Sequence, residues 1–175
     1  VMDYPRIRRT GFNLKMKFNT YGFQILHSDL KEMSAPALIG MTNSFQFVEK
    51  TSKLKIGNGL DKDTNLGPIT TQKRLEEIEN LVEDTKASGA KVLCGGQRPA
   101  GFNKGYFYEP TIFDDVKDDF KIMKEEPFGP LSPITTFKSF DEVIERANNH
   151  EVGLAGYICT ASMETAQRSS ELMQT

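Results

Sequence analysis

The chain has 175 residues with 24 acidic and 22 basic side chains, which predicts one domain with a sizeable core rather than two domains. A net charge of −2 and scattered basic residues argue against binding to nucleic acid or to an anionic membrane surface. No apolar run approaches the roughly 20 residues of a membrane-spanning helix, and no stretch has the pattern of a signal-peptide core.

The two cysteines, Cys94 and Cys159, lack the spacing of a metal site or of a redox pair. Each lies in a strand-like apolar run, which favours a buried thiol that packs as a small hydrophobic side chain. Unpaired thiols fit a reducing compartment, so we expect a cytoplasmic protein without a metal site.

Residues 1–46 show weak periodicity and scattered phenylalanines, and they stay unassigned as a divergent or irregular segment. Ala37–Met41 could belong to a helix, but Pro36 and Gly40 argue against a long one. We expect mostly irregular structure with at most one short helix or strand. The segment could be a divergent lead-in, a fusion, or a sequence outside its proper reading frame.

Helical and strand-like patterns alternate from Phe47 onward. Phe47–Leu54 has the pattern of a helix end, closed by a Gly-Asn-Gly turn at residues 57–59. Thr70 or Thr71 can cap a helix that runs to about Ser88 and stops at Gly89. Its predicted buried face carries Leu75, Ile78 and Val82.

Three further strand-like segments, one extended segment and two helices follow. Lys91–Cys94 predicts a short buried strand, and Gly105–Phe113 an extended segment crossed by a proline. Leu131–Phe137 and Leu154–Cys159 also have the pattern of buried strands. Strands separated by helices predict an α/β fold with a largely parallel sheet covered by helices. We expect the strands near 91–94, 131–137 and 154–159 to share this sheet.

The two helices near the end of the chain each have a recognisable start. Ser139–Glu142 has the sequence of a capping box. Ser162 begins the last helix. The predicted apolar positions of the two helices are Val143, Ile144 and Ala147 in the first and Met163, Ala166 and Leu172 in the second.

The run Lys124–Pro130 contains two carboxylates, two prolines and a glycine around one phenylalanine. Prolines prevent regular hydrogen bonding there, so side chains take non-repetitive positions. Glu126 and Phe128 would present a carboxylate to a sugar diol and a ring to a flat heterocycle. The alternative is a plain turn with solvated acids before a strand.

Other segments place this run in a larger pattern. They are Leu66–Ile69, Cys94–Gly96, Gly105–Phe113, Ala147–Asn149 and Gly153–Ala155. In their order and spacing, these segments and the Lys124–Pro130 run resemble the C-terminal part of the catalytic domain of the aldehyde dehydrogenase superfamily, over residues 47–175. The sequence of Glu125–Pro133 is similar to that of the succinate-semialdehyde dehydrogenase-like branch of this superfamily.

This resemblance implies an NAD- or NADP-dependent enzyme that oxidises an aldehyde to a carboxylic acid through a cysteine thioester, as a homo-oligomer. Glu126 would hold the nicotinamide ribose hydroxyls and Phe128 would pack beside the nicotinamide ring. Glu125 is expected to be a solvated or loop-fixing acid. Asn148 matches an Ala-Asn element of the family, although a helix C-terminal cap is the favoured interpretation.

The family's nucleophilic cysteine would fall around Gln24–Lys31, where this chain has none. His27 and Ser28 lie there, but without an orienting acid they are interpreted as surface residues. The general base and the dinucleotide-binding turn would lie before residue 1. No catalytic residue is assigned, and we expect the isolated chain to be inactive.

Two alternatives belong to other functional classes. One is a non-catalytic module that associates with full-length subunits, and the other is a free-standing nucleotide binder that uses Glu126 and Phe128. A nucleotide binder needs a phosphate-binding loop, and the Gly-Asn-Gly turn at residues 57–59 lacks the preceding strand and following helix.

Overall fold

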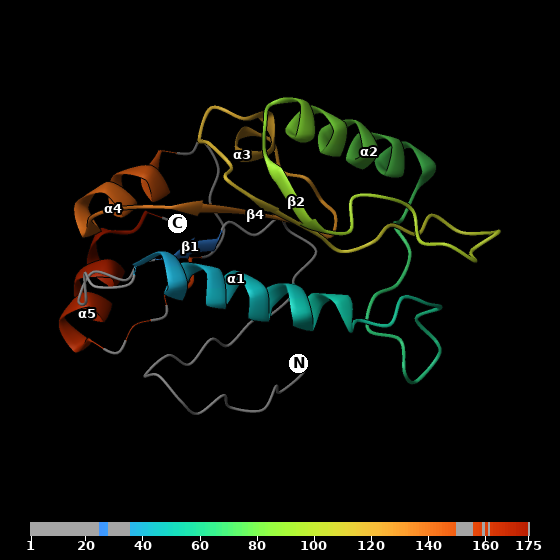
Figure 1. The fold of residues 1–175 in the computed structure, drawn as a ribbon, viewed down its shortest axis with the longest axis horizontal. Helices are drawn as coiled ribbons and strands as arrows, with labels where there is room; N and C mark the ends of the chain where they lie inside the picture. The colour runs from blue at the N-terminus through green and yellow to red at the C-terminus, as the bar shows by residue number, and fades with distance from the viewer. Residues whose placement is uncertain (1–24, 28–35, 150–155, 159, 161, 175) are drawn as a thin grey trace. The chain divides into compact units, whose positions relative to one another are not determined.

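The computed structural model describes residues 25–27, 36–149, 156–158, 160 and 162–174 (Figure 1). The chain divides into two compact units, Thr20–Phe137 and a second formed by Val1–Asn19 with Lys138–Thr175. The strands are β1 (Ile25–His27), β2 (Lys91–Cys94), β3 (Thr111–Asp114) and β4 (Leu131–Thr136). The helices are α1 (Pro36–Ser52), α2 (Gln72–Ala87), α3 (Lys121–Lys124), α4 (Phe140–Asn148) and α5 (Met163–Leu172).

The four strands form one sheet in the order β1-β4-β3-β2. Strand β4 pairs in parallel with both β1 and β3, whereas β2 pairs antiparallel with β3. The connection from β2 to β3 contains no helix, so it can return along the edge of the sheet without a crossover. The expected α/β fold with a largely parallel sheet is therefore confirmed, with β2 as its antiparallel edge.

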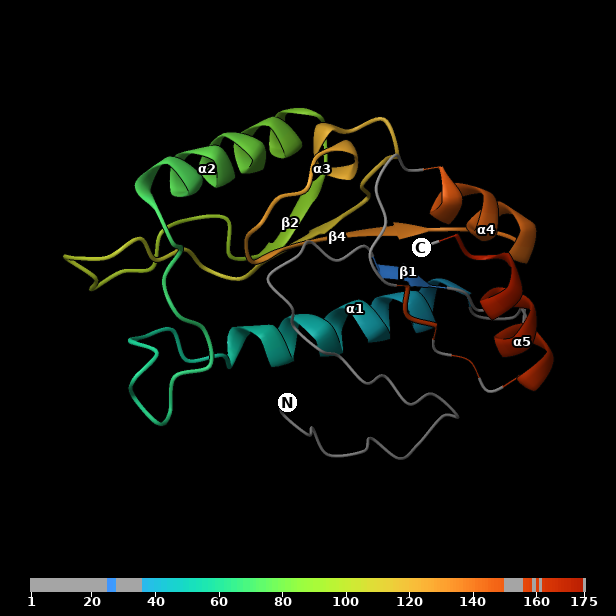
Figure 2. The ribbon, with the colours of Figure 1, turned by 180° about the vertical axis from the view of Figure 1, so that it is seen from behind.

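Helices cover this sheet on both sides. In the unit Thr20–Phe137, α2 and α3 lie on one side of the sheet and α1 lies on the other, and the view from behind shows the same arrangement (Figures 1 and 2). The segments 91–94 and 131–136 share the sheet as predicted, but β3 separates them. Of the third segment, 154–159, the described residues 156–158 are not in a strand, and the others lie outside the described part of the chain.

Helix α2 follows directly from its sequence. The Thr71 hydroxyl accepts a hydrogen bond from the Arg74 backbone N–H at 3.2 Å, which satisfies one of the free donors of the first turn. The helix ends at Ala87, just before Gly89, which has a φ of +100°. Its buried residues are Leu75, Ile78, Leu81, Val82 and Thr85, so the predicted helix and its buried face are confirmed.

The main core lies between α2, α3 and the sheet. Leu75, Ile78 and Val82 of α2 are at most 1% exposed, and Phe113 of β3 is fully buried. Fully burying a side chain of this size stabilises a fold by about 1.5–3 kcal/mol. The other members of this core cluster are Leu81, Tyr108, Val116, Phe120, Ile122, Met123 and Leu131.

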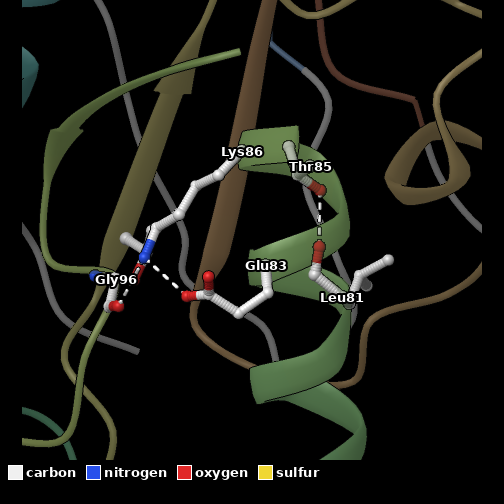
Figure 3. A network of polar contacts seen from close by, with 6 residues as sticks. Leu81, Glu83, Thr85, Lys86 and Gly96 are labelled. Atoms are coloured by element: carbon white, nitrogen blue, oxygen red, sulfur yellow. Dashed lines mark hydrogen bonds and ion pairs between the residues drawn. The ribbon is translucent and has the colours of Figure 1, made fainter. Parts of the chain in front are cut away.

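The C-terminal half of α2 also holds the turn after β2 (Figure 3). The Lys86 ammonium donates to the Gly96 carbonyl at 3.2 Å and pairs with Glu83 at 2.8 Å. Gly95 has a φ of +73°, and a Cβ at this position would overlap the Pro110 carbonyl. A side chain at Gly95 is therefore excluded both by its backbone conformation and by space.

Helix α1 is longer than its sequence suggested. It begins at Pro36 and includes Gly40, so the prediction that these residues prevent a long helix is wrong. Proline at the first helical position loses no intrahelical hydrogen bond, and one interior glycine costs only about 1 kcal/mol. Burial of Phe47, which is 6% exposed, offsets that cost. The expectation of at most one short helix or strand in residues 1–46 is also wrong, because the described part of this segment forms β1 and the first part of α1. Residues 1–24 and 28–35 lie outside the described residues.

Helices α4 and α5 belong to the second unit. The Ser139 hydroxyl accepts from the Glu142 N–H at 3.2 Å, and the Glu142 carboxylate accepts from the Lys138 N–H at 2.8 Å. This confirms the predicted cap, although Glu142 reaches the residue before the capping serine. The Arg168 guanidinium lies 4.4 Å from the centroid of the Phe140 ring and joins the two helices.

Candidate cofactor-binding site

The Glu125–Pro130 loop connects α3 to β4. Its Glu125 N–H donates to the Lys121 carbonyl at 3.0 Å, which ends α3, and its Pro130 carbonyl accepts from the Thr111 N–H at 2.8 Å. Pro127 is buried, whereas the residues on either side of it, Glu126 and Phe128, are exposed. The loop is thus attached through its ends and its proline and presents its carboxylate and its ring.

Phe128 has an unusual backbone conformation. Its φ is +41°, in the left-handed region that residues other than glycine rarely adopt. Such a residue costs about 1–3 kcal/mol and persists only where its surroundings hold it. Its ring remains 38% exposed. Backbone outliers of this kind cluster at active sites and ligand-binding sites, which makes Phe128 a candidate for contact with a ligand.

Helix α2 contacts the Glu125–Pro130 loop at two places. The Arg74 guanidinium carbon lies 5.1 Å from the centroid of the Phe128 ring, within the range of a cation–π interaction. Gly129 lies so close to Ile78 that a Cβ there would overlap the Ile78 side chain. Arg74 also forms an ion pair with Glu77 at 2.8 Å.

A hollow of about 310 Å³ lies between α2 and this loop. It is lined by Arg74, Glu77, Leu81, Glu125, Glu126 and Pro127. The volume is at the lower end of the range for ligand pockets, about 300–1,000 Å³. Three carboxylates face a single guanidinium there, so the lining has a net negative charge and suits hydroxyl groups or a cationic ring.

Glu126 therefore lines the hollow, and Phe128, two residues later, has its ring in contact with the Arg74 guanidinium. Within the described part of the chain, Glu126 forms no hydrogen bond or ion pair, so its carboxylate is available to a ligand. Sequence reasoning missed Arg74 and Glu77. Their only sequence signal is an i, i+3 charge pair on α2, and such pairs occur on many helix surfaces.

The remaining candidates have structural explanations or lie outside the described residues. Burial raises the pKa of the Cys94 thiol, which is half-buried in β2, so it holds little thiolate at neutral pH. The Asn148 amide donates to the Leu172 carbonyl at 2.8 Å, and its oxygen accepts from the Gln174 N–H at 2.9 Å, which ties the end of α4 to the end of α5. Cys159, Ser28 and the His27 side chain are not described.

A second hollow, of about 540 Å³, shares no lining residue with the first. It includes Gly57 and Asn58 of the Gly-Asn-Gly turn, together with the Phe102 and Phe107 rings, whose centroids are 4.3 Å apart. Among the described residues, no group of three or more histidine, cysteine or acidic side chains could hold a metal ion. No helix in that part of the chain is long and apolar enough to cross a membrane.

Comparison with known proteins extends these observations. The profile of the aldehyde dehydrogenase family matches residues 43–175. A betaine aldehyde dehydrogenase from Brucella anthropi is 45% identical over 125 residues, which cover 70% of this chain and 26% of the relative. This chain thus spans about a quarter of the length of the curated relatives it matches.

Two solved structures show the same fold. The NAD+ complex of an aldehyde dehydrogenase from Bacillus cereus matches with a TM-score of 0.72 and 40% identity, over 76% of this chain and 27% of that one. A succinate-semialdehyde dehydrogenase from Burkholderia pseudomallei matches with a TM-score of 0.74 and 33% identity, over 78% of this chain and 28% of that one.

Proposed function

This chain belongs to the aldehyde dehydrogenase family, and from this we propose that the protein containing it oxidises an aldehyde to a carboxylic acid with NAD+ or NADP+. The family match and the relatives named for aldehyde oxidation support the reaction class. The neighbour solved with NAD+ supports the cofactor. We assign residues 47–175 to part of the catalytic domain and leave 1–46 unassigned.

The carboxylate of Glu126, which pairs with no described residue, is the observation that carries this proposal. It lines a hollow of negative charge, next to the exposed ring of Phe128. These residues fit a nicotinamide riboside, because a carboxylate accepts two hydroxyl protons and an aromatic ring packs against a flat heterocycle. Glu126 would hold the ribose hydroxyls and Phe128 would pack beside the nicotinamide, which accepts a hydride from the substrate when it is bound.

We propose that the nucleophile is a cysteine thiolate that forms a thioester, as the family resemblance implies. The described part of this chain does not supply it, because Cys94 is half-buried in a strand and its thiol has a raised pKa. The segment therefore contributes to cofactor binding, and we expect the isolated chain to lack dehydrogenase activity.

The substrate class, the oligomeric state and the location are each proposed on separate grounds. A semialdehyde substrate is supported by the sequence of Glu125–Pro133 and by the similarity of this chain to the solved succinate-semialdehyde dehydrogenase. A homo-oligomeric enzyme follows from the family resemblance alone. A cytoplasmic location is proposed from cysteine usage alone, whereas one relative, from Leishmania tarentolae, is named a mitochondrial aldehyde dehydrogenase.

The substitution Glu126→Gln in a full-length protein that carries this segment tests the proposal. It keeps the shape of the side chain but removes the charge that strengthens hydrogen bonds to ribose hydroxyls, at a cost of about 1–3 kcal/mol. We expect cofactor affinity or the rate of hydride transfer to fall by about 5- to 150-fold. Both are measured by cofactor titration and by single-turnover absorbance of the reduced nicotinamide.

Glu76→Gln is the matched control, because it removes the same charge at an exposed position of α2 that does not line the hollow. The Glu76 carboxylate accepts a hydrogen bond from the Gln72 side-chain amide at 2.8 Å, so it is already engaged within α2. We expect this variant to bind cofactor and transfer hydride nearly as the parent does. If Glu126→Gln leaves cofactor affinity and hydride transfer unchanged, Glu126 has no role in binding the ribose.

A further inference from the structure

We propose that Arg74 is a positioning residue, whose guanidinium holds the Phe128 ring in the orientation that receives the nicotinamide. This inference rests on the proposed function, because it gives Arg74 a role only if Phe128 packs beside the cofactor. Arg74 itself is expected to act through Phe128 and not through a bond to the ligand.

The Phe128 ring needs support beyond burial. Its backbone has a φ of +41°, and its side chain is 38% exposed. A strained residue relaxes unless its surroundings hold it, and a ring this exposed gains only part of the stabilisation of a buried one. Contacts from a neighbouring element must therefore contribute to its conformation.

Arg74 is well placed to provide such a contact, because it is itself held. Its backbone N–H is bonded to the capping hydroxyl of Thr71, and its guanidinium pairs with Glu77 at 2.8 Å. The Arg74 side chain is 35% exposed, so it is partly covered. A planar group fixed in this way can stack on a ring with little further loss of conformational freedom.

The second contact from α2 reinforces the first. Ile78 follows Arg74 by one helical turn, so both side chains lie on the same side of α2. Arg74 contacts the Phe128 ring, and Ile78 fills the space that a side chain at Gly129 would need. Arg74 thus contacts Phe128, and Ile78 contacts the next loop residue, Gly129. Together these contacts restrain both the ring and the adjacent backbone.

The charges around the hollow argue for positioning rather than for attraction of an anion. Arg74 shares the lining with Glu77, Glu125 and Glu126, so one positive charge faces three negative ones. Oxidised nicotinamide is a cation, and an unpaired guanidinium beside it would repel it. The ion pair with Glu77 offsets that repulsion and leaves the planar face of Arg74 for the ring of Phe128.

The test uses the 175-residue chain with nicotinamide mononucleotide as the probe, followed by nuclear magnetic resonance. Arg74→Lys keeps the charge but lacks the planar group, and Arg74→Met lacks both. We expect both variants to weaken binding of the probe by about two- to fivefold, the range of an exposed cation–π contact. A ring-current shift on the Arg74 side-chain protons should be present in the parent chain and absent in Phe128→Leu.

Lys73→Met is the matched control, because Lys73 is 87% exposed, lies 3.9 Å from Glu77 and is adjacent to Arg74. It should leave both the probe affinity and the ring-current shift unchanged. Parent-like binding by Arg74→Lys, with weak binding by Arg74→Met alone, would show that charge matters and would overturn the positioning role. Absence of the ring-current shift in the parent chain would overturn it as well.

Failure of the proposed function gives a different result. If Glu126→Gln weakens probe binding while Arg74→Lys and Arg74→Met bind as the parent does, only the role of Arg74 is wrong. If the parent chain does not bind the probe at all, the cofactor-binding role of the Glu125–Pro130 loop is wrong, and the inference about Arg74 is overturned with it.

Discussion

Helices α2 and α4 begin in the same way and yet differ in what they bury. Thr71 and Ser139 each accept a hydrogen bond at 3.2 Å from the backbone N–H three residues later. Five residues of α2 are buried, whereas no residue of α4 is. A hydroxyl cap and an apolar stripe are thus enough to start a helix, but its contribution to stability depends on what packs against the stripe.

The difference extends to the function of each helix. The buried face of α2 is part of the main core, and the half-buried Arg74, one turn before the buried Ile78, contacts the Phe128 ring of the Glu125–Pro130 loop. In α4 the predicted apolar residues Val143, Ile144 and Ala147 are half-buried. We therefore expect substitutions that destabilise α2 to disturb the candidate site, even where they lie outside the Glu125–Pro130 loop.

Core truncation should give the largest contrast between the two helices. Leu75→Ala in α2 removes a side chain that is 1% exposed, and we expect it to lower the free energy of unfolding by about 2–5 kcal/mol. Ile144→Ala in α4 removes a half-buried side chain and should cost about 1 kcal/mol or less. Urea titration with separate backbone resonances for each unit measures both, and equal losses would contradict the comparison.

Alkaline pH should destabilise the core next to α2. Burial, followed by the charges of Glu79, Glu83 and Glu109, raises the pKa of Tyr108 to about 12, and this side chain is 3% exposed. The folded chain keeps the Tyr108 proton to a higher pH than the unfolded chain does. The contribution of Tyr108 to the free energy of unfolding is therefore fully present below pH 10, and it falls by roughly 1.4 kcal/mol per pH unit between pH 10 and 12.

Tyr108→Phe should remove this part of the pH dependence, as measured by urea titration at a series of pH values. Tyr106→Phe is the control, because Tyr106 is 39% exposed and lies on the same extended segment. A Tyr108→Phe chain that loses stability above pH 10 as steeply as the parent would show that the buried phenol is not responsible.

Removal of the helix caps should produce a smaller effect that isolates local from tertiary stabilisation. Thr71→Ala and Ser139→Ala each remove one capping hydrogen bond, which is worth about 1 kcal/mol. In α2 the buried core should keep the helix formed, whereas the first turn of α4 should lose helicity because no buried residue supports it. Amide hydrogen exchange at residues 72–75 and 140–143 distinguishes these outcomes. Equal fraying at both starts would show that core packing does not support the first turn of α2.

The smallest expected effect concerns the ion pair between Arg98 and Glu79 of α2. The Arg98 guanidinium donates to both Glu79 oxygens, at 2.6 and 2.8 Å, and this hydrogen bonding lowers the pKa of Glu79. Arg98→Met should cost at most about 1 kcal/mol at neutral pH, because the pair is partly exposed.

The cost of Arg98→Met should shrink as the pH falls below the ordinary glutamate value of about 4.3, since protonation of Glu79 removes the pair in the parent chain. Arg98→Lys is the control, because it keeps the charge and loses only the two-pronged geometry. A cost that does not change between pH 7 and pH 3 would indicate lost packing rather than a lost ion pair.

Several features of this protein follow from the sequence by itself, because the interactions that determine them are local. The cap at Thr71, the buried stripe of α2, its end before Gly89 and the cap at Ser139 all depend on residues within one or two turns. Two prolines around Phe128 likewise make the Glu125–Pro130 loop irregular, so Glu126 and Phe128 could be selected as candidates before the fold was known.

Other features were decided only by the tertiary structure. The antiparallel direction of β2 depends on the path of the helix-free connection to β3, and the start of α1 at Pro36 depends on how the rest of that helix packs. The contact between Arg74 and Phe128 joins residues that are distant in sequence and share no pattern. Periodicity and capping depend only on neighbours along the chain, so sequence reasoning found the residues of the loop and predicted α2, but did not find the contact between them.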